Sequence, residues 1–179
     1  MTERKLPALL ILGLAGLVLP GHSPYLQWYA YRAKHLVVVA DGARPGSVDL
    51  ANAIASTLTS RWPESKAIAA TARSSREVVS LLVSGQLQVG LLPAAVALEA
   101  VEGRGAFKLD GKAPLRAVAS IGEEVLVVLD SFAPERAFAI AQALSTSRTD
   151  GAIADKLPLA RTPILLHPGA LQYYRQNTR

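Results

Sequence analysis

Runs of apolar, β-branched residues alternate with single helical patterns along most of this chain, and this alternation constrains the fold more than any other feature. Residues 35–40 form a continuous run, His-Leu-Val-Val-Val-Ala, which is typical of a strand buried on both faces of a sheet. In residues 48–61, Leu50, Ile54 and Leu58 recur at the spacing of one helical face. The pattern then predicts strands over residues 67–71, 88–92, 115–121 and 124–129, and helices over residues 74–84, 94–102 and 134–144. Strands separated by single helices predict an α/β fold with a single doubly wound, mostly parallel sheet flanked by helices.

Local signals mark the ends of the predicted helices. Pro63 ends the first helix, because proline cannot continue one. Ser74 or Ser75 can cap the second helix, and Gly85 suits the left-handed conformation that often ends a helix. Pro134 is expected in the first turn of the last predicted helix. These signals support the helix boundaries independently of the apolar pattern.

The composition predicts one folded domain and argues against several functions. Half of the 179 residues are hydrophobic, so the roughly 145 residues after the leader suffice for a core. There is no cysteine, which excludes disulfides, thiolate metal ligands and a lipid-modified N-terminal cysteine. The net charge of +5 is scattered rather than clustered, so we expect no nucleic-acid partner. Weak attraction to anionic membrane lipid is the expected consequence of this charge.

The N-terminal residues 1–34 are predicted to be a signal-anchor or transmembrane segment. Residues 6–19 are strongly apolar and, with the uncharged stretch that follows, are long enough to span a bilayer as a helix. Tyr25, Trp28 and Tyr29 are the candidate membrane-interface residues. A cleaved signal peptide is the alternative, but Pro24 follows its best small-residue pair and disfavours cleavage there. We therefore expect an uncleaved anchor before a single α/β lobe over residues 35–179.

The C-terminal run Leu-Leu-His-Pro-Gly-Ala-Leu-Gln-Tyr-Tyr-Arg, residues 165–175, is the most specific motif in the chain. It closely resembles the C-terminal signature of TAXI-type solute receptors of TRAP transporters, which are periplasmic binding proteins. The resemblance implies a two-lobed fold with solute bound between the lobes. Here residues 35–130 resemble the first part of lobe one, and Asp130 runs almost directly into the helix predicted at residues 134–144. The resemblance therefore covers one lobe, and the second lobe is missing.

The family's solute-binding residues carry over only in part. Thr71 and Ser74 match the family's Thr-Gly-Gly-Ser stretch, but both glycines are replaced, and Arg73 is the one residue there that could attract a carboxylate. The family's polar Gln…Asp pair falls on residues 93–95, Pro-Ala-Ala, which offer no side-chain hydrogen bond. Thr71, Arg73 and Ser74 are the candidate ligand-binding residues, with an exposed, solvated arginine as the plainer interpretation of Arg73. Because these solute-binding residues of the family are replaced, we do not expect tight binding of a small molecule.

The sequence offers no pattern that favours catalysis, a metal or a cofactor. His22, His35 and His167 are far apart, and none has a second ligand one helical turn away. Glu123 and Glu124 are adjacent, so they would point to opposite sides of a strand. The nucleophile-elbow and phosphate-loop motifs are lacking as well. We therefore expect a non-enzymatic protein without cofactor or metal.

Tyr173, Tyr174 and Arg175 have two interpretations. As scaffold residues, one tyrosine would pack on the domain and the other would present its hydroxyl at the surface. As functional residues, all three could contact a partner protein or lipid headgroups together with the basic C-terminal end. The scaffold interpretation is favoured because the run belongs to the family signature.

Two functions follow from these observations. The first is a membrane-anchored, non-enzymatic periplasmic binding or scaffolding subunit, which docks on an integral-membrane protein complex or transporter subunit. The alternative is a solute-binding component of a TRAP-type transporter for small carboxylates or amino acids, completed by another chain or by a dimer. The resemblance places the folded part on the periplasmic side of the bacterial inner membrane, since the flanking charges of the anchor do not decide its orientation.

Overall fold

The computed structural model describes residues 31, 34–146 and 162–177. The predicted anchor, with Tyr25, Trp28 and Tyr29, lies outside these residues apart from Tyr31 and Lys34. In the described part of the chain, no helix has the length and apolar character needed to cross a membrane. Residues Lys34–Arg179 cluster as one compact unit.

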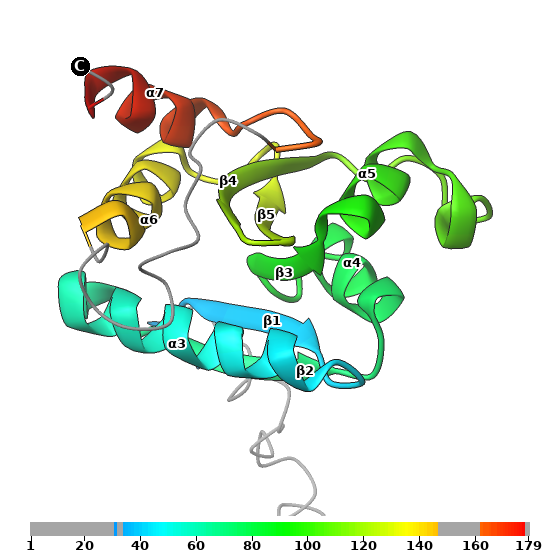
Figure 1. Cartoon of the computed structure of the whole chain (residues 1–179), viewed down its shortest axis with the longest axis horizontal. Coiled ribbons are helices and arrows are strands. Elements are labelled where there is room, and N and C mark those ends of the chain that lie inside the picture. The colour runs from blue at the N-terminus through cyan, green and yellow to red at the C-terminus, as the bar shows by residue number, and fades with distance from the viewer. Residues whose placement is uncertain (1–30, 32–33, 147–161, 178–179) are drawn as a thin grey trace, which may run out of the picture. The chain divides into compact units, whose positions relative to one another are not determined.

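The unit contains a five-stranded sheet with helices on both sides (Figure 1). Its order is β2-β1-β3-β5-β4, and its strands are β1 (Val37–Asp41), β2 (Ile68–Ala72), β3 (Val89–Pro93), β4 (Leu115–Ile121) and β5 (Glu124–Leu129). Strand β1 pairs in parallel with β2 and β3, whereas β5 is antiparallel to both β3 and β4. The predicted α/β fold is thus confirmed, but the mostly parallel sheet is corrected to a mixed one.

The tight connection between β4 and β5 explains the mixed sheet. Gly122 and Glu123 alone separate the two strands, and Gly122 has a φ of 62°. So short a connection joins antiparallel neighbours, because a parallel crossover needs a dozen or more residues. Strand β5 therefore folds back beside β4 and occupies the position between β4 and β3.

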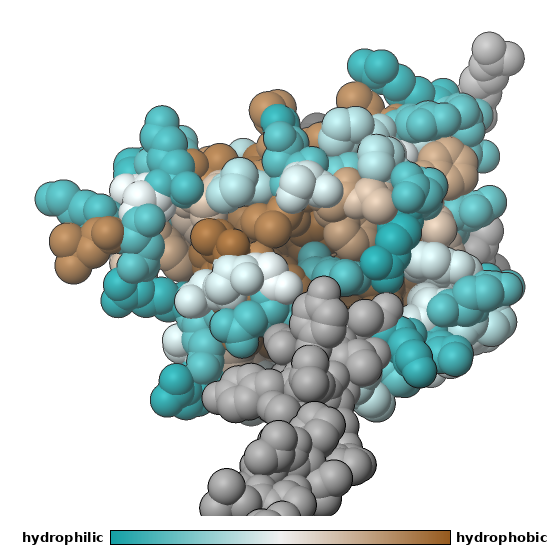
Figure 2. Space-filling model, turned by 180° about the vertical axis from the view of Figure 1, so that it is seen from behind, coloured by the Kyte–Doolittle hydropathy of each residue, from teal (hydrophilic) through white to brown (hydrophobic). Residues whose placement is uncertain are grey.

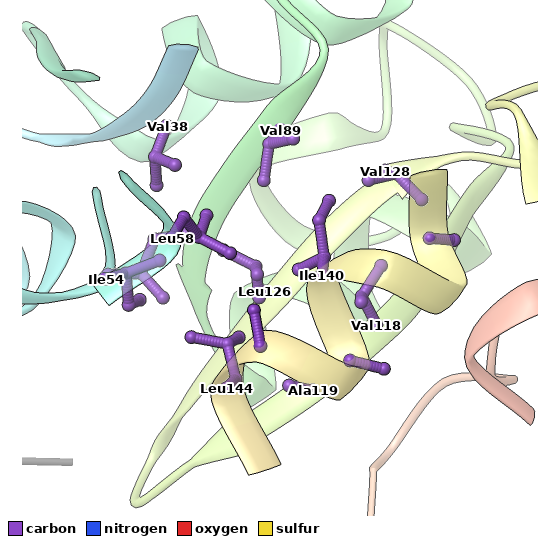
Figure 3. Packing of buried hydrophobic residues seen from close by; sticks show 14 of the residues in the cluster. Val38, Ile54, Leu58, Val89, Val118, Ala119, Leu126, Val128, Ile140 and Leu144 are labelled. Carbon is purple, nitrogen blue, oxygen red and sulfur yellow. The ribbon is translucent and has the colours of Figure 1, made fainter. Parts of the chain in front are cut away.

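The helices divide into two layers. On one side of the sheet lie α3 (Pro45–Arg61), α6 (Pro134–Thr146) and α7 (Pro168–Asn177), and on the other lie α4 (Ser75–Val83) and α5 (Ala94–Glu102). Figure 3 shows the first layer, in which Leu58 of α3, Ile140 of α6 and Leu126 of β5 meet. These three side chains are fully buried. Alternate residues of each strand supply the two cores, as expected for a sheet covered on both faces.

The predicted helix ends agree with the structure. Ser74 is the N-cap of α4, and its side chain accepts a hydrogen bond from the backbone N–H of Glu77. Gly85, just after α4, has the expected left-handed φ of 69°. Trp62 follows α3 and donates its backbone N–H to the carbonyl of Leu58. The additional helix α7, over the C-terminal signature, was not predicted from the sequence.

The chain passes from β5 to α6 without leaving the unit. The backbone N–H of Asp130 donates to the carbonyl of Pro114 over 2.8 Å, and that of Phe132 donates to Leu129 over 3.0 Å. Helix α6 begins at Pro134 and packs beside α3 on the same sheet. At the position where a two-lobed receptor would cross to its second lobe, this chain makes a short turn.

Candidate functional site

The carboxyl edge of the sheet is the candidate position for a ligand site. In open α/β sheets, ligands bind outside the carboxyl ends of the strands, where successive crossovers leave on opposite faces. Here β1 has β2 on one side and β3 on the other, and α3 and α4 cover opposite faces. The N-termini of α3 and α4 both lie at this edge, and helix N-termini attract anions because their first N–H groups have no partner within the helix.

Asp41 occupies the N-terminus of α4. The aspartate is the last residue of β1 and is buried. Its Oδ2 accepts hydrogen bonds from the backbone N–H of Ser75 over 2.9 Å and from the Ser75 hydroxyl over 2.8 Å. Its Oδ1 accepts from the backbone N–H of Ala43 over 2.9 Å. The first turn of α4 therefore already holds a carboxylate, which belongs to the chain itself.

Glu124 lies in the corresponding position at the N-terminus of α3, on the opposite face of the sheet. This buried glutamate begins β5, and its Oε1 accepts a hydrogen bond from the Ser47 hydroxyl over 2.7 Å. Ser47 is the third residue of α3. Arg44, at the N-cap, places its Nη2 3.4 Å from the same oxygen. The other oxygen, Oε2, is buried and has no hydrogen-bond partner among the described residues.

The three candidate ligand-binding residues lie together where β2 passes into α4. Thr71 is exposed near the end of β2, and Ser74 caps α4. The Arg73 side chain is 91% exposed and pairs with Glu77, its Nη2 lying 3.0 Å from the carboxylate. Hydrogen bonds from the Arg73 guanidinium and backbone N–H lower the pKa of Glu77. Arg73 and Ser74 therefore both interact with Glu77 of the helix that they precede.

The third helix at this edge, α5, offers no side-chain donor. Pro93 is its N-cap and makes no side-chain capping hydrogen bond. The backbone N–H of Ala94 donates to the carbonyl of Glu123 over 2.8 Å. The edge residues 93–95 therefore lack side-chain donors, as their sequence indicates.

The C-terminal signature joins α7 to the sheet and to α6. His167 is buried, and its backbone N–H donates to the carbonyl of Ala117 in β4 over 2.8 Å. Its Nδ1 accepts from the backbone N–H of Gly169 over 3.3 Å, so the imidazole caps α7, and Pro168 occupies the first helical position. Gly169 passes so close to α6 that a Cβ atom there would lie 1.9 Å from the carbonyl oxygen of Pro134. His167 therefore joins the start of α7 to β4.

Both signature tyrosines are buried in the domain. The Tyr174 hydroxyl donates to the carbonyl of Val118 over 2.8 Å, and burial raises the pKa of Tyr174. The Tyr173 ring packs edge-on against Phe138, with 5.4 Å between the ring centroids. Packing of α7 on α6 and β4 covers most of both residues. The expectation that one of the two hydroxyls reaches the surface stays a prediction. Arg175 is exposed, and its contact with a partner or with lipid stays a prediction.

Sequence reasoning missed the two buried carboxylates, Asp41 and Glu124. A signal was present for Asp41, because it directly follows a continuous apolar strand and so falls at the carboxyl edge. Glu124 comes after the turn residues Gly122 and Glu123 and gave no comparable signal. Within the described residues, His, Asp and Glu side chains do not gather in groups of three or more that could hold a metal ion.

A scan against protein-family models and a search of curated proteins each find no match for this chain. The TAXI resemblance therefore rests on the residues quoted from the sequence, and the function that it implies is a proposal.

Proposed function

We propose that this chain is a membrane-anchored, non-enzymatic periplasmic binding or scaffolding subunit. It uses a single TAXI-receptor-like lobe to dock on an integral-membrane protein complex. The observation that carries the proposal is the occupation of the carboxyl edge by the chain's own carboxylates, Asp41 and Glu124. A receptor for anionic solutes would keep those helix N-termini open.

Two features of this edge oppose the binding of an anionic solute. They are the negative charge of Asp41 and the hydrogen bonds that the helix N–H groups already make within the chain. The N–H of Ser75 is already donated to Asp41, and that of Glu77 is donated to Ser74. A solute that took both Ser75 donors would leave Oδ2 of the buried Asp41 carboxylate without hydrogen bonds, which costs about 1–3 kcal/mol or more for a charged group. A solute carboxylate beside an undisplaced Asp41 would be repelled by it. Both routes weaken the binding of small carboxylates.

The alternative is a solute receptor completed by another chain or by a dimer. One observation favours it, namely the two arginines at the edge, Arg44 and Arg73. The Arg44 side chain is about half exposed and Arg73 is almost fully exposed, so each could turn toward a solute carboxylate. Each of them, however, already pairs with a glutamate of the chain.

Calorimetry separates the two functions. We expect the purified domain to bind amino acids and small carboxylates no more tightly than about millimolar, which corresponds to about −4 kcal/mol. The full chain, extracted in mild detergent, is expected to co-purify with a membrane protein complex that mass spectrometry can identify. A micromolar dissociation constant for the monomer would refute the scaffolding function and support the receptor.

A further inference from the structure

A groove runs along α4, from Arg76 near its N-terminus to Ser84 just after its last residue. It has a volume of about 460 Å³ and runs between α4 and the segment of residues 107–113. This volume is within the range of about 300–1,000 Å³ that is usual for ligand sites. The buried side chains of Val79, Phe107 and Ala113 line it, together with the half-exposed Val83. We call this feature the α4 groove.

The wall of the α4 groove opposite the helix is held in place. Arg76 of α4 donates two hydrogen bonds to Asp110, each of 2.7 Å, one from Nε and one from Nη2. The backbone N–H groups of Asp110 and Gly111 both donate to the carbonyl of Phe107 over 3.0 Å. The backbone hydrogen bonds shape residues 107–111, and the Arg76–Asp110 pair and the buried Phe107 side chain join this segment to the rest of the domain.

Two exposed apolar side chains lie on the two elements that form the groove, Val83 on α4 and Leu109 on the segment of residues 107–113. Val83 is 51% exposed and Leu109 is 92% exposed. The segment that carries Leu109 projects from the unit beyond α5 (Figure 1), and apolar atoms are visible at its end in Figure 2, at the left. Leu109 is not among the residues that line the groove. A small molecule in the groove would leave Leu109 in water, whereas the surface of a partner protein would cover both.

The charges around the groove favour an acidic partner. Asp110 neutralises Arg76, whereas Lys112, which lines the groove, and Lys108, which does not, form no ion pair with the described residues. The rim is therefore positive. A second copy of the chain would bring the same lysines together, and like charges across an interface are unfavourable.

We propose that the α4 groove binds a short segment of a partner protein. The segment places one large apolar side chain in the groove beside Val83 and Phe107, and an acidic side chain against Lys112. The residues on either side of this apolar side chain cover Leu109. The proposal rests on the docking function proposed above, because it names the surface with which the domain would dock.

Matched peptides test the proposal on the full chain in mild detergent. The probe is a fluorescein-labelled, glutamate-rich peptide with a central phenylalanine, and its binding is followed by fluorescence polarisation. We expect at least about tenfold weaker binding when the phenylalanine is replaced by serine or the glutamates by lysine. Leu109→Asp and Lys112→Glu should each weaken binding of the first peptide by a similar factor, and both positions are exposed enough for the domain to fold unchanged. Lys112→Glu should also improve binding of the lysine peptide, which loss of folding cannot do.

Two control variants carry the same chemical changes elsewhere on the domain. Lys66→Glu and Leu165→Asp alter exposed residues outside the α4 groove, and both should bind the first peptide like the unaltered chain. Equal binding of acidic and basic peptides, no binding of any peptide, or no effect of Lys112→Glu would each overturn the proposal. A dimer that Leu109→Asp dissociates would also overturn it, in favour of a second copy as the occupant.

Co-purification in detergent distinguishes failure of this proposal from failure of the docking function. If Leu109→Asp retains the membrane partners of the unaltered chain, the groove is not the docking surface, although the docking function stands. If the unaltered chain retains no partner, the docking function itself fails.

Discussion

At the scale of single residues, buried polar groups at the carboxyl edge hold the helices in place. Asp41 joins the end of β1 to the start of α4, and Glu124 joins the start of β5 to α3. Each carboxylate lies where the helix dipole favours negative charge. In a binding protein, the same positions would be available to an anionic ligand. Here they connect sheet to helix.

Replacing Asp41 by alanine tests this structural role. We expect Asp41→Ala to lower the free energy of unfolding by about 1–3 kcal/mol, because the N–H of Ser75 loses its acceptor and α4 loses a favourable charge. Urea denaturation of the purified domain measures the loss. Asp49→Ala is the matched control, since Asp49 is exposed on α3, and it should change stability by less than about 0.5 kcal/mol. Equal effects of the two variants would contradict the role of Asp41.

Gly169 provides a second test, because its role is close contact rather than charge. Gly169→Ala should destabilise the domain by at least about 2 kcal/mol, since its Cβ would overlap the Pro134 carbonyl and push α7 away from α6. Gly46→Ala is the control, because Gly46 lies near the start of α3 and a Cβ there meets no atom within 4 Å. It should be neutral or slightly stabilising. Thermal unfolding of the two variants under one condition compares them, and an unaffected Gly169→Ala would mean that α7 packs differently.

At the scale of secondary-structure elements, connections decide the arrangement of the unit. The two-residue turn between β4 and β5 makes the sheet mixed, and the short turn after β5 returns the chain to α6 on the same sheet. The segment of residues 103–114 is attached to α4 through the ion pair between Arg76 and Asp110. That pair is exposed to solvent, so the attachment depends on the ionisation of Asp110.

Acid should loosen this segment. The Arg76 guanidinium, mainly by hydrogen bonding, lowers the pKa of Asp110 from its ordinary value of 3.8. Because the folded-state pKa is depressed, the stabilisation is present above pH 3.8 and is lost as the pH falls through the lower folded-state pKa. The protection factors of the amides at residues 107–111, which compare measured with intrinsic exchange at each pH, should therefore fall in that acidic range. The effect is small, because solvent screens an exposed pair.

Arg76→Gln is the matched variant for the acid experiment. It removes the charge that lowers the pKa of Asp110, so the protection factors at residues 107–111 should already be lower at neutral pH and should fall little further in acid. NMR titration of the Asp110 carboxyl measures the pKa directly. An ordinary pKa in the unaltered domain would show that the ion pair does not persist in solution.

At the scale of the whole molecule, the proposed function depends on the joining of a membrane segment to a folded lobe. We predict that residues 1–34 remain attached as an anchor, because Pro24 disfavours the best cleavage site. Intact-mass spectrometry of the protein extracted from membranes should give the full-length chain. A soluble periplasmic species beginning between residues 22 and 36 would contradict the anchor.

Local sequence patterns were sufficient to predict the approximate bounds of most elements and the residues that cap them. Residues 115–121 and 124–129 form strands as predicted, and Ser74 and Gly85 lie at the ends of α4. These features depend on preferences of the backbone and on contacts within one or two helical turns, so neighbouring residues suffice to specify them.

Local patterns could not predict the strand order, the carboxylates at the helix N-termini or the α4 groove. Asp41 and Ser75 are 34 residues apart in sequence, and Ser47 and Glu124 are 77 apart. Whether such pairs meet depends on which strands are neighbours, and the hydrophobic effect that brings the strands together is non-directional. Apolar periodicity therefore predicts that a side chain is buried but not which partner it finds, and the burial of both Tyr173 and Tyr174 follows from where α7 packs.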